Sequence, residues 1–170
     1  MEDTTRADIF GFVIPLVKAI NDMGNQAGMK IKFRICDTLG VGKPFNGHKL
    51  PRSVPGLMYY IKNTAGLDSS QLEWHGHNDY YYCTANSTAA WMYGASSVST
   101  TLLGIGERTG NCPMESMLVE YHQLKTPKNK INFEKLNDVV LFFEKEFGYK
   151  IHSKMPFLGT EFNATSAGIH

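Results

Sequence analysis

The chain has 170 residues, of which 42% are hydrophobic and 19% are charged, a composition typical of a folded domain and not of a disordered chain. Because 17 basic residues oppose 16 acidic ones, the formal charge is only +1, which indicates no nucleic-acid or membrane-surface partner. No apolar run approaches the roughly 18 residues of a membrane span. The scattered cysteines Cys36, Cys83 and Cys112 predict reduced thiols and a cytoplasmic location.

Segments with helical and strand periodicity alternate along the chain. From Phe10 to Ile20, apolar residues recur every three or four positions, as in an amphipathic helix that Asp8 begins and Gly24 ends. From Ile31 to Ile35 they alternate with charged residues, as in a strand. In chain order the pattern predicts helices and strands in alternation over 8–23, 30–36, 53–65, 71–77, 79–93, 97–103 and 113–123. Such alternation requires parallel strands joined by helical crossovers.

The last quarter of the sequence differs from the rest. The stretch 125–130 (K-T-P-K-N-K) predicts a linker, and an amphipathic helix follows, which Gly148 closes. We therefore expect one domain over 1–125 and a linker helix with an accessory segment over 126–170. Three strands are too few for an eight-stranded barrel, which needs about 200–250 residues. The α/β pattern thus predicts either a small open sheet or part of a barrel.

Polar residues follow each of the three predicted strands. Asp37-Thr38 ends the first, His75-Gly-His77-Asn-Asp ends the second, and the glycine loop 104–111 follows the third. In parallel α/β folds, functional sites form at this carboxyl edge of the sheet. Three consecutive strands that end in such residues predict a site there.

Two histidines in an H-x-H pattern are the strongest candidates for metal binding. Residues two apart on a strand point the same way, so His75 and His77 converge, and two neutral imidazoles suit a divalent transition metal. The alternative is a pair of polar residues at a strand end, satisfied by neighbours or water. The glycine loop G-I-G-E-R-T-G-N invites comparison with phosphate-binding loops, but it does not match G-x-G-x-x-G. The favoured interpretation is a tight strand-to-helix turn in which Glu107 and Arg108 form an ion pair.

Together these motifs resemble the homocitrate synthase and 2-isopropylmalate synthase family of metal-dependent, HMG-CoA-lyase-like barrels. The resemblance rests on D-T-L-G (37–40), H-G-H-N-D (75–79), G-I-G-E-R-T-G-N (104–111), the opening E-D-T-T-R-A-D (2–8) and the closing S-A-G-I-H (166–170). The residues in and directly after the first two motifs are most similar to those of the Re-type citrate synthase branch. The resemblance implies the C-terminal half of a (β/α)8 TIM barrel, with strands six to eight, followed by a linker helix and the start of an accessory subdomain.

The resemblance also implies roles for individual residues. His75 and His77 correspond to the two histidine metal ligands, and Asn111 to the asparagine that completes or supports the metal shell. Thr38 corresponds to the threonine that holds the substrate carboxylate. Glu2 corresponds to the glutamate beside the 2-oxo acid, which makes it a catalytic and substrate-binding candidate.

Two departures from the family pattern concern proton transfer and the first strand. His170 corresponds to the second histidine of the H-x-x-G-I-H motif and is the other catalytic candidate. Thr165 stands where the family has the first histidine of that motif, so the general base is not identified. No counterpart of the Arg-Asp pair on the family's first strand is present. Glu107 and Arg108 are expected to play structural roles.

The resemblance implies an acyltransferase that condenses acetyl-CoA with a 2-oxo acid, either oxaloacetate to citrate or 2-oxoglutarate to homocitrate. In this Claisen-type reaction a divalent metal (Mn²⁺, Mg²⁺ or Co²⁺, with Zn²⁺ also suitable) polarises the keto group. We expect a homodimer in the full-length protein and an inactive fragment in the chain alone. The alternatives are a metal-dependent carbon–carbon lyase of the same superfamily and a catalytically inactive half-barrel.

Overall fold

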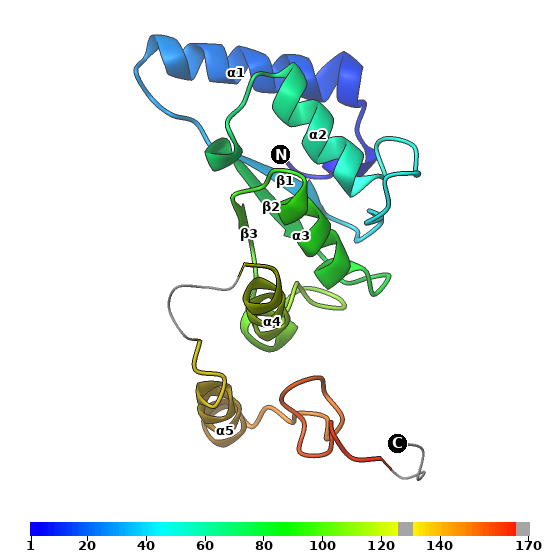
Figure 1. Ribbon diagram of the computed structural model, residues 1–170, viewed down its shortest axis with the longest axis vertical. Coiled ribbons are helices and arrows are strands. Elements are labelled where there is room, and N and C mark those ends of the chain that lie inside the picture. The colour runs from blue at the N-terminus through cyan, green and yellow to red at the C-terminus, as the bar shows by residue number, and fades with distance from the viewer. Residues whose placement is uncertain (126–130, 166–170) are drawn as a thin grey trace. The chain divides into compact units, whose positions relative to one another are not determined.

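Three short parallel strands form the sheet of the computed structural model, hydrogen-bonded in the order β1, β2, β3 (Figure 1). The strands are β1 (Phe33–Asp37), β2 (Leu72–Gly76) and β3 (Ser97–Val98). The α-helices are α1 (Ile14–Gln26), α2 (Val54–Thr64), α3 (Cys83–Met92), α4 (Met114–Lys125) and α5 (Lys135–Phe147). Shorter helical turns lie at Thr4–Arg6, Ile9–Val13, Ser69–Gln71 and Leu102–Gly104. The predicted parallel α/β architecture is confirmed.

The structure describes residues 1–125 and 131–165. The chain divides into two compact units, Met1–Met117 and Leu118–His170. The first unit holds the whole sheet with α1, α2 and α3, and the second holds α5. Most of the predicted linker lies outside the described residues, so the expected domain boundary at 125/126 stays a prediction.

One face of the sheet is apolar and packs against helices. Alternate residues of β1 and β2 point to this face because side chains alternate along a strand. The core there joins sheet and helices through the buried side chains of Ile35, Leu72, Trp74, Val17 of α1, Leu57 of α2 and Ala90 of α3. This burial explains why the intervening helices carry their apolar residues at helical spacing.

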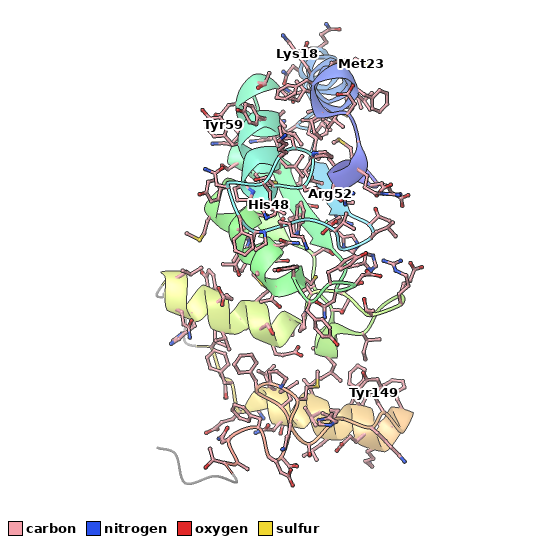
Figure 2. All side chains as sticks on the ribbon, turned by 90° about the vertical axis from the view of Figure 1, so that its right-hand side faces the viewer. Lys18, Met23, His48, Arg52, Tyr59 and Tyr149 are labelled. Carbon is pink, nitrogen blue, oxygen red and sulfur yellow. The ribbon has the colours of Figure 1, made fainter. Side chains whose placement is uncertain are left out.

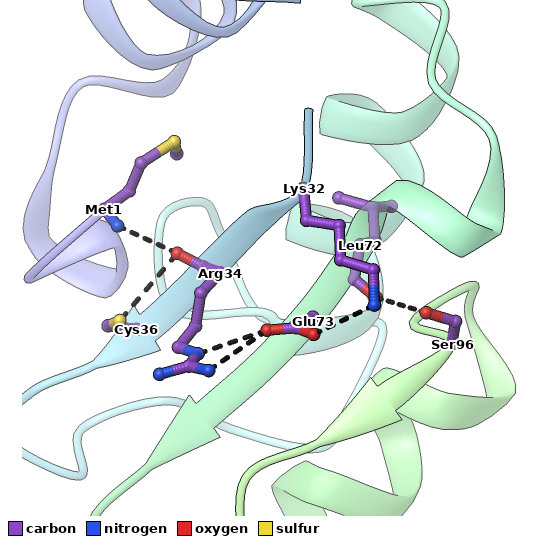
Figure 3. A network of polar contacts seen from close by, with 7 residues as sticks. All are labelled: Met1, Lys32, Arg34, Cys36, Leu72, Glu73 and Ser96. Carbon is purple, nitrogen blue, oxygen red and sulfur yellow. Dashed lines mark hydrogen bonds and ion pairs between the residues drawn. The ribbon is translucent and has the colours of Figure 1, made fainter. Parts of the chain in front are cut away.

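The opposite face of the sheet carries charged side chains (Figure 3). Arg34 of β1 donates from its Nη2 to Oε2 of Glu73 on β2 at 3.2 Å, and the Lys32 ammonium lies 3.4 Å from Oε1 of Glu73. His75 follows Glu73 by two positions and so points to the same face. The β1–β2 register pairs it with Cys36. The sheet thus separates a helix-covered apolar face from a polar one.

The predicted third strand is much shorter in the structure. Only Ser97 and Val98 pair with β2, and the backbone then leaves the sheet. Leu103 adopts a left-handed φ of 59° inside the turn at Leu102–Gly104, which is incompatible with an extended strand. The run of β-branched and hydroxyl residues up to Thr101 predicted a strand because strand propensity cannot report where pairing partners end.

Two helix boundaries also differ from the sequence prediction. Asp8 does cap the first helical segment, where its carboxylate accepts from the Gly11 N–H, but this segment opens with a π-helical turn. Gly24 does not end α1. It is buried inside the helix, and a Cβ there would lie 2.5 Å from the Ile31 side chain, so close packing explains the glycine. The third helix begins only at Cys83, because Tyr81 has a left-handed φ of 62°.

The second unit is built around α5. Val140 is its buried position, and Leu158 is buried in the segment that follows. Gly148 ends the helix as predicted, with a left-handed φ of 61° and its N–H bonded to the Glu144 carbonyl at 3.1 Å. Among the described residues, no helix in either unit is both long and apolar enough to cross a membrane.

Candidate functional site

A pocket of about 400 Å³ lies at the carboxyl end of β1 and β2. Four segments contribute to it: the N-terminal residues, the end of β1, the end of β2 and the glycine loop. The lining residues are Glu2, Cys36, Thr38, His75, His77, Gly106, Glu107 and Asn111. The structure therefore brings together all the predicted site residues that it describes. The remaining one, His170, lies outside the described residues.

The two histidines face each other across the pocket floor. His75 Nε2 lies 3.3 Å from His77 Nε2, and the rings are nearly perpendicular at 88°. Burial, then repulsion by His77, lowers the pKa of His75, so this imidazole is neutral at pH 7 and keeps a lone pair. Within the described part of the chain, the Nδ1 atoms of both rings are buried without a hydrogen-bond partner.

Asn111 is held beside His77 by the glycine loop. Its N–H donates to the Gly104 carbonyl at 2.9 Å, and the Asn78 N–H donates to the Gly110 carbonyl at 3.0 Å. The loop thereby forms a short antiparallel bridge between Asn111 and His77. The Asn111 Oδ1 is buried and accepts no hydrogen bond from any described residue. A buried acceptor in this state is available for a ligand or an ion.

These three side chains fit part of a metal shell. Two imidazole nitrogens bound at about 2.1 Å and at right angles to one metal lie about 3.0 Å apart. The observed 3.3 Å between the two Nε2 atoms is close to that separation. Across residues 1–125 and 131–165, no cluster of three or more His, Cys, Asp or Glu side chains could hold a metal ion. The described residues thus offer two nitrogens and the Asn111 oxygen, a partial set that suits a divalent metal.

The N-terminal segment runs along the end of β1 and positions Glu2 and Thr38. The Met1 ammonium donates to the Arg34 carbonyl at 2.9 Å (Figure 3), and the Asp3 N–H donates to Thr38 Oγ1 at 2.8 Å. Thr38 Oγ1 therefore accepts one hydrogen bond from the backbone and keeps its own proton for donation. Glu2, an exposed residue that lines the same pocket, directly precedes Asp3 in the chain.

Asp37 lies below the pocket and holds the surrounding loops together. Its carboxylate is fully buried and accepts from Thr5 Oγ1 at 2.7 Å, from the Val41 N–H at 2.9 Å and from the Gly42 N–H at 3.0 Å. Burial raises the pKa of Asp37, and these hydrogen bonds act against the rise. The sequence pointed to Asp37-Thr38 as one polar unit, but only Thr38 lines the pocket.

Arg108 connects the three loops that follow the strands. Its Nη2 donates to the Thr38 carbonyl at 2.6 Å, and its Nε donates to Asp79 Oδ1 at 2.9 Å. The expected pair with Glu107 is present but longer, at 3.6 Å. Glu107 itself lines the pocket as part of the glycine loop. No sequence pattern indicates the contact with Asp79, because the two residues are far apart in the chain.

Gly110 is expected to be intolerant of a side chain. It has a left-handed φ of 92°, and a Cβ there would collide with the Gly104 carbonyl oxygen that accepts the Asn111 N–H. Gly110→Ala should lower the free energy of unfolding by about 1–3 kcal/mol, measured by denaturant titration. Gly47→Ala is the control, because no heavy atom lies within 4 Å of its Cβ position. Equal stability of the two variants would contradict this reading of the loop.

Comparisons with known proteins agree on one family. A family model described as HMGL-like matches residues 1–142. The chain is 49% identical over 170 residues to a citrate (Re)-synthase of Clostridium kluyveri, covering 100% of this chain and 38% of that protein. It is 44% identical over 169 residues to a citrate (Re)-synthase of Syntrophus aciditrophicus, covering 99% of this chain and 27% of that protein. A homocitrate synthase of Nostoc is 29% identical over 169 residues, covering 99% of this chain and 41% of that protein.

Solved structures agree on the fold. An HMG-CoA lyase from Acinetobacter baumannii, solved with coenzyme A and 3-methylmalate, superposes with a TM-score of 0.62 at 18% identity, covering 91% of this chain and 47% of that one. The carboxyl transferase domain of Rhizobium etli pyruvate carboxylase gives a TM-score of 0.58 at 17% identity, covering 85% of this chain and 21% of that one. The parallel strands and their helices are thus part of an α/β barrel.

The chain spans 27% to 41% of the length of the curated relatives above. Because the family model covers residues 1–142, the chain belongs to the HMGL-like family.

Proposed function

We propose that this chain is part of an acyltransferase that condenses acetyl-CoA with a 2-oxo acid. The observation that carries the proposal is the convergence of Glu2, Thr38, His75, His77 and Asn111 on one pocket. Similarity to two citrate (Re)-synthases, at 49% and 44% identity, favours oxaloacetate as the oxo acid and citrate as the product. The alternative oxo acid is 2-oxoglutarate, which gives homocitrate.

We assign the metal to His75, His77 and Asn111. Imidazole nitrogens and an amide oxygen that accepts no hydrogen bond from a described residue are ligands for Mn²⁺, Mg²⁺ or Co²⁺, and Zn²⁺ also suits them. When bound, a divalent cation acts as a Lewis acid towards the keto oxygen of the substrate. The lowered pKa of His75 assists this role, because a protonated imidazole cannot bind a metal.

Thr38 is assigned to the carboxylate of the 2-oxo acid. Because its oxygen already accepts the Asp3 N–H, its hydroxyl proton is free to be donated to a substrate carboxylate. Glu2 is assigned a catalytic place beside the oxo acid. In the reaction, a base takes a methyl proton from acetyl-CoA, the methyl carbon bonds to the keto carbon, and the keto oxygen gains a proton. Water then cleaves the thioester and releases CoA.

His170 is our second candidate for proton transfer, and Thr165 replaces the histidine that the family places five residues before it. We further propose that residues 1–125 supply strands six to eight of the barrel and that 126–170 begin an accessory segment. A homodimer and a cytoplasmic location complete the proposal for the full-length protein. A lyase remains the alternative activity, although the likeness to HMG-CoA lyase, at 18% identity, concerns the fold alone.

The test uses the protein at its natural full length. Acetyl-CoA is mixed with oxaloacetate or with 2-oxoglutarate, and free thiol and product mass are followed together. We expect thiol release to match the formation of citrate, to stop with a chelator and to return with Mn²⁺. Cleavage of a carbon–carbon bond without condensation would favour the lyase. Thiol release without a new carbon–carbon bond would contradict the proposal.

A further inference from the structure

A second pocket, of about 270 Å³, lies outside the candidate site and is basic and aromatic in character. It is lined by Val41, Lys43, His48, Arg52 and Tyr80, and we call it the Lys43 pocket. Figure 2 shows His48 and Arg52 on the same side of the molecule. Two permanent cations and a histidine on one small concave surface are suited to an anionic ligand.

Backbone hydrogen bonds hold the two cations of this pocket side by side. The Lys43 N–H donates to the Arg52 carbonyl at 2.8 Å, and the Val54 N–H donates to the Lys43 carbonyl at 2.9 Å. Ser53 Oγ donates to the Phe45 carbonyl at 3.0 Å within the same loop. The loop between Lys43 and Arg52 is therefore closed at its base. A ligand there meets two cationic residues whose backbone is already held in place, which lowers the entropic cost of ordering the loop on binding.

Aromatic rings orient the Lys43 ammonium. It lies 4.1 Å from the centroid of the Tyr82 ring and 5.4 Å from that of Tyr80. Both Lys43 and Arg52 are partly buried, and no ion pair or side-chain hydrogen bond within the described residues involves either cationic group. The positive charge of Arg52 favours the ionised forms of the Asp3 and Asp37 carboxyls, but it forms no direct ion pair with them. Partly buried cations that make no direct ion pair with a described carboxylate favour a bound anion. Tyr80, which is 57% exposed, adds a flat apolar surface on which a nucleobase can stack.

The Lys43 pocket lies close to the candidate site because the same two strands lead to both. Val41 follows Thr38 by three residues, and Tyr80 follows His77 by three residues, so each step spans about 10 Å at most. The two loops also touch, since a Cβ on Gly40 would lie 2.9 Å from the His77 carbonyl oxygen. A single extended ligand with an anionic end can therefore reach both pockets.

We propose that the Lys43 pocket binds the phosphate groups at the nucleotide end of the acyl-CoA donor. This proposal rests on the proposed function, which requires a thioester whose reactive carbon enters the candidate site. Lys43 and Arg52 contact the phosphates, and Tyr80 stacks on the adenine. Coenzyme A combines several phosphate charges, an adenine and a long flexible arm, which suit the positive charge of the Lys43 pocket, its aromatic wall and its position beside the candidate site.

The first experiment measures nucleotide binding without catalysis. Adenosine 3′,5′-bisphosphate, which carries the phosphorylated nucleoside but no thioester, is titrated calorimetrically into the full-length protein. We expect Lys43→Gln with Arg52→Gln to weaken binding at least about tenfold, the scale of lost charge-assisted hydrogen bonds. Lys43→Arg, which retains the charge, should preserve binding. Lys18→Gln is the control, because Lys18 is an exposed lysine on α1, away from this loop (Figure 2).

The second experiment separates the phosphate contacts from the chemistry. The double variant should raise KM for acetyl-CoA about tenfold. It should leave KM for acetyl-pantetheine, which lacks the phosphates, and KM for the oxo acid unchanged. An equal loss with both thioesters would overturn the proposal, as would unchanged bisphosphate binding in the double variant. Inorganic phosphate that binds as tightly as the bisphosphate would show a simple phosphate site and would also overturn it. Cation-dependent bisphosphate binding in a protein without condensation activity would instead support the nucleotide site and contradict the proposed function.

Discussion

Thr38→Ala is expected to lower kcat/KM for the 2-oxo acid by about 10- to 150-fold in the full-length protein. The reason is the loss of a charge-assisted hydrogen bond of roughly 1.5–3 kcal/mol from the hydroxyl to the substrate carboxylate. KM for acetyl-CoA should change much less, because the thioester does not use this donor. Steady-state kinetics with each substrate varied in turn measures both quantities.

Thr38→Ser is the matched variant, since it retains the hydroxyl and removes only a methyl group. The hydroxyl also accepts the Asp3 N–H at 2.8 Å, so a structural role predicts that alanine lowers the melting temperature and leaves oxo-acid kinetics alone. Serine should restore both properties if the donor matters. Equal kcat/KM of the alanine and serine variants for the oxo acid would remove Thr38 from the site.

His75→Ala should lower the affinity of the full-length protein for a divalent metal by at least about tenfold, and condensation should fall with it. The variant removes one of two nitrogens that lie 3.3 Å apart and leaves His77 without its neighbour. The metal content of the purified protein and a metal titration that monitors binding directly are the measurements. The titration is independent of turnover, so it tests the ligand and not the overall reaction.

His152→Ala is the control for this prediction, because His152 is exposed and lies outside the pocket. It should bind metal like the unaltered protein. Unchanged metal affinity in His75→Ala would exclude the ligand role. The candidate site would then consist of two imidazoles that satisfy only each other.

Much of the fold follows from periodicity in the sequence. Buried residues alternate with partly exposed ones along β2, and Ser53 caps α2 through the Gly56 N–H at 3.1 Å. Both features are local, so sequence patterns report them directly. The short β3 and the helical turn at Leu102–Gly104 depend on a distant contact, in which the buried carboxylate of Glu115 accepts the Leu103 N–H at 3.2 Å. No periodicity encodes such a contact.

The candidate site was predictable to a similar extent. His75, His77 and Thr38 are predictable because they lie at the ends of parallel strands, and strand ends are recognisable in the sequence. The burial of Asp37 and the lack of a described partner for the Asn111 oxygen are not predictable, because both arise from loops that meet only in three dimensions. The Lys43 pocket is likewise not predictable from the sequence. Its cations and aromatic residues come from two separate loops, and neither loop contains a motif.

The Arg108 side chain has a consequence for redesign of this protein. It binds the Thr38 carbonyl after β1 and the Asp79 carboxylate after β2, from a position in the loop after β3. A graft that removes Asp79 or Arg108 with its loop would leave the other residue without its partner, and one that alters the loop after β1 would shift the Thr38 carbonyl that Arg108 binds. Substrate range is therefore best transferred by moving all three loops as a single block, with Arg108 and Asp79 kept as a matched pair.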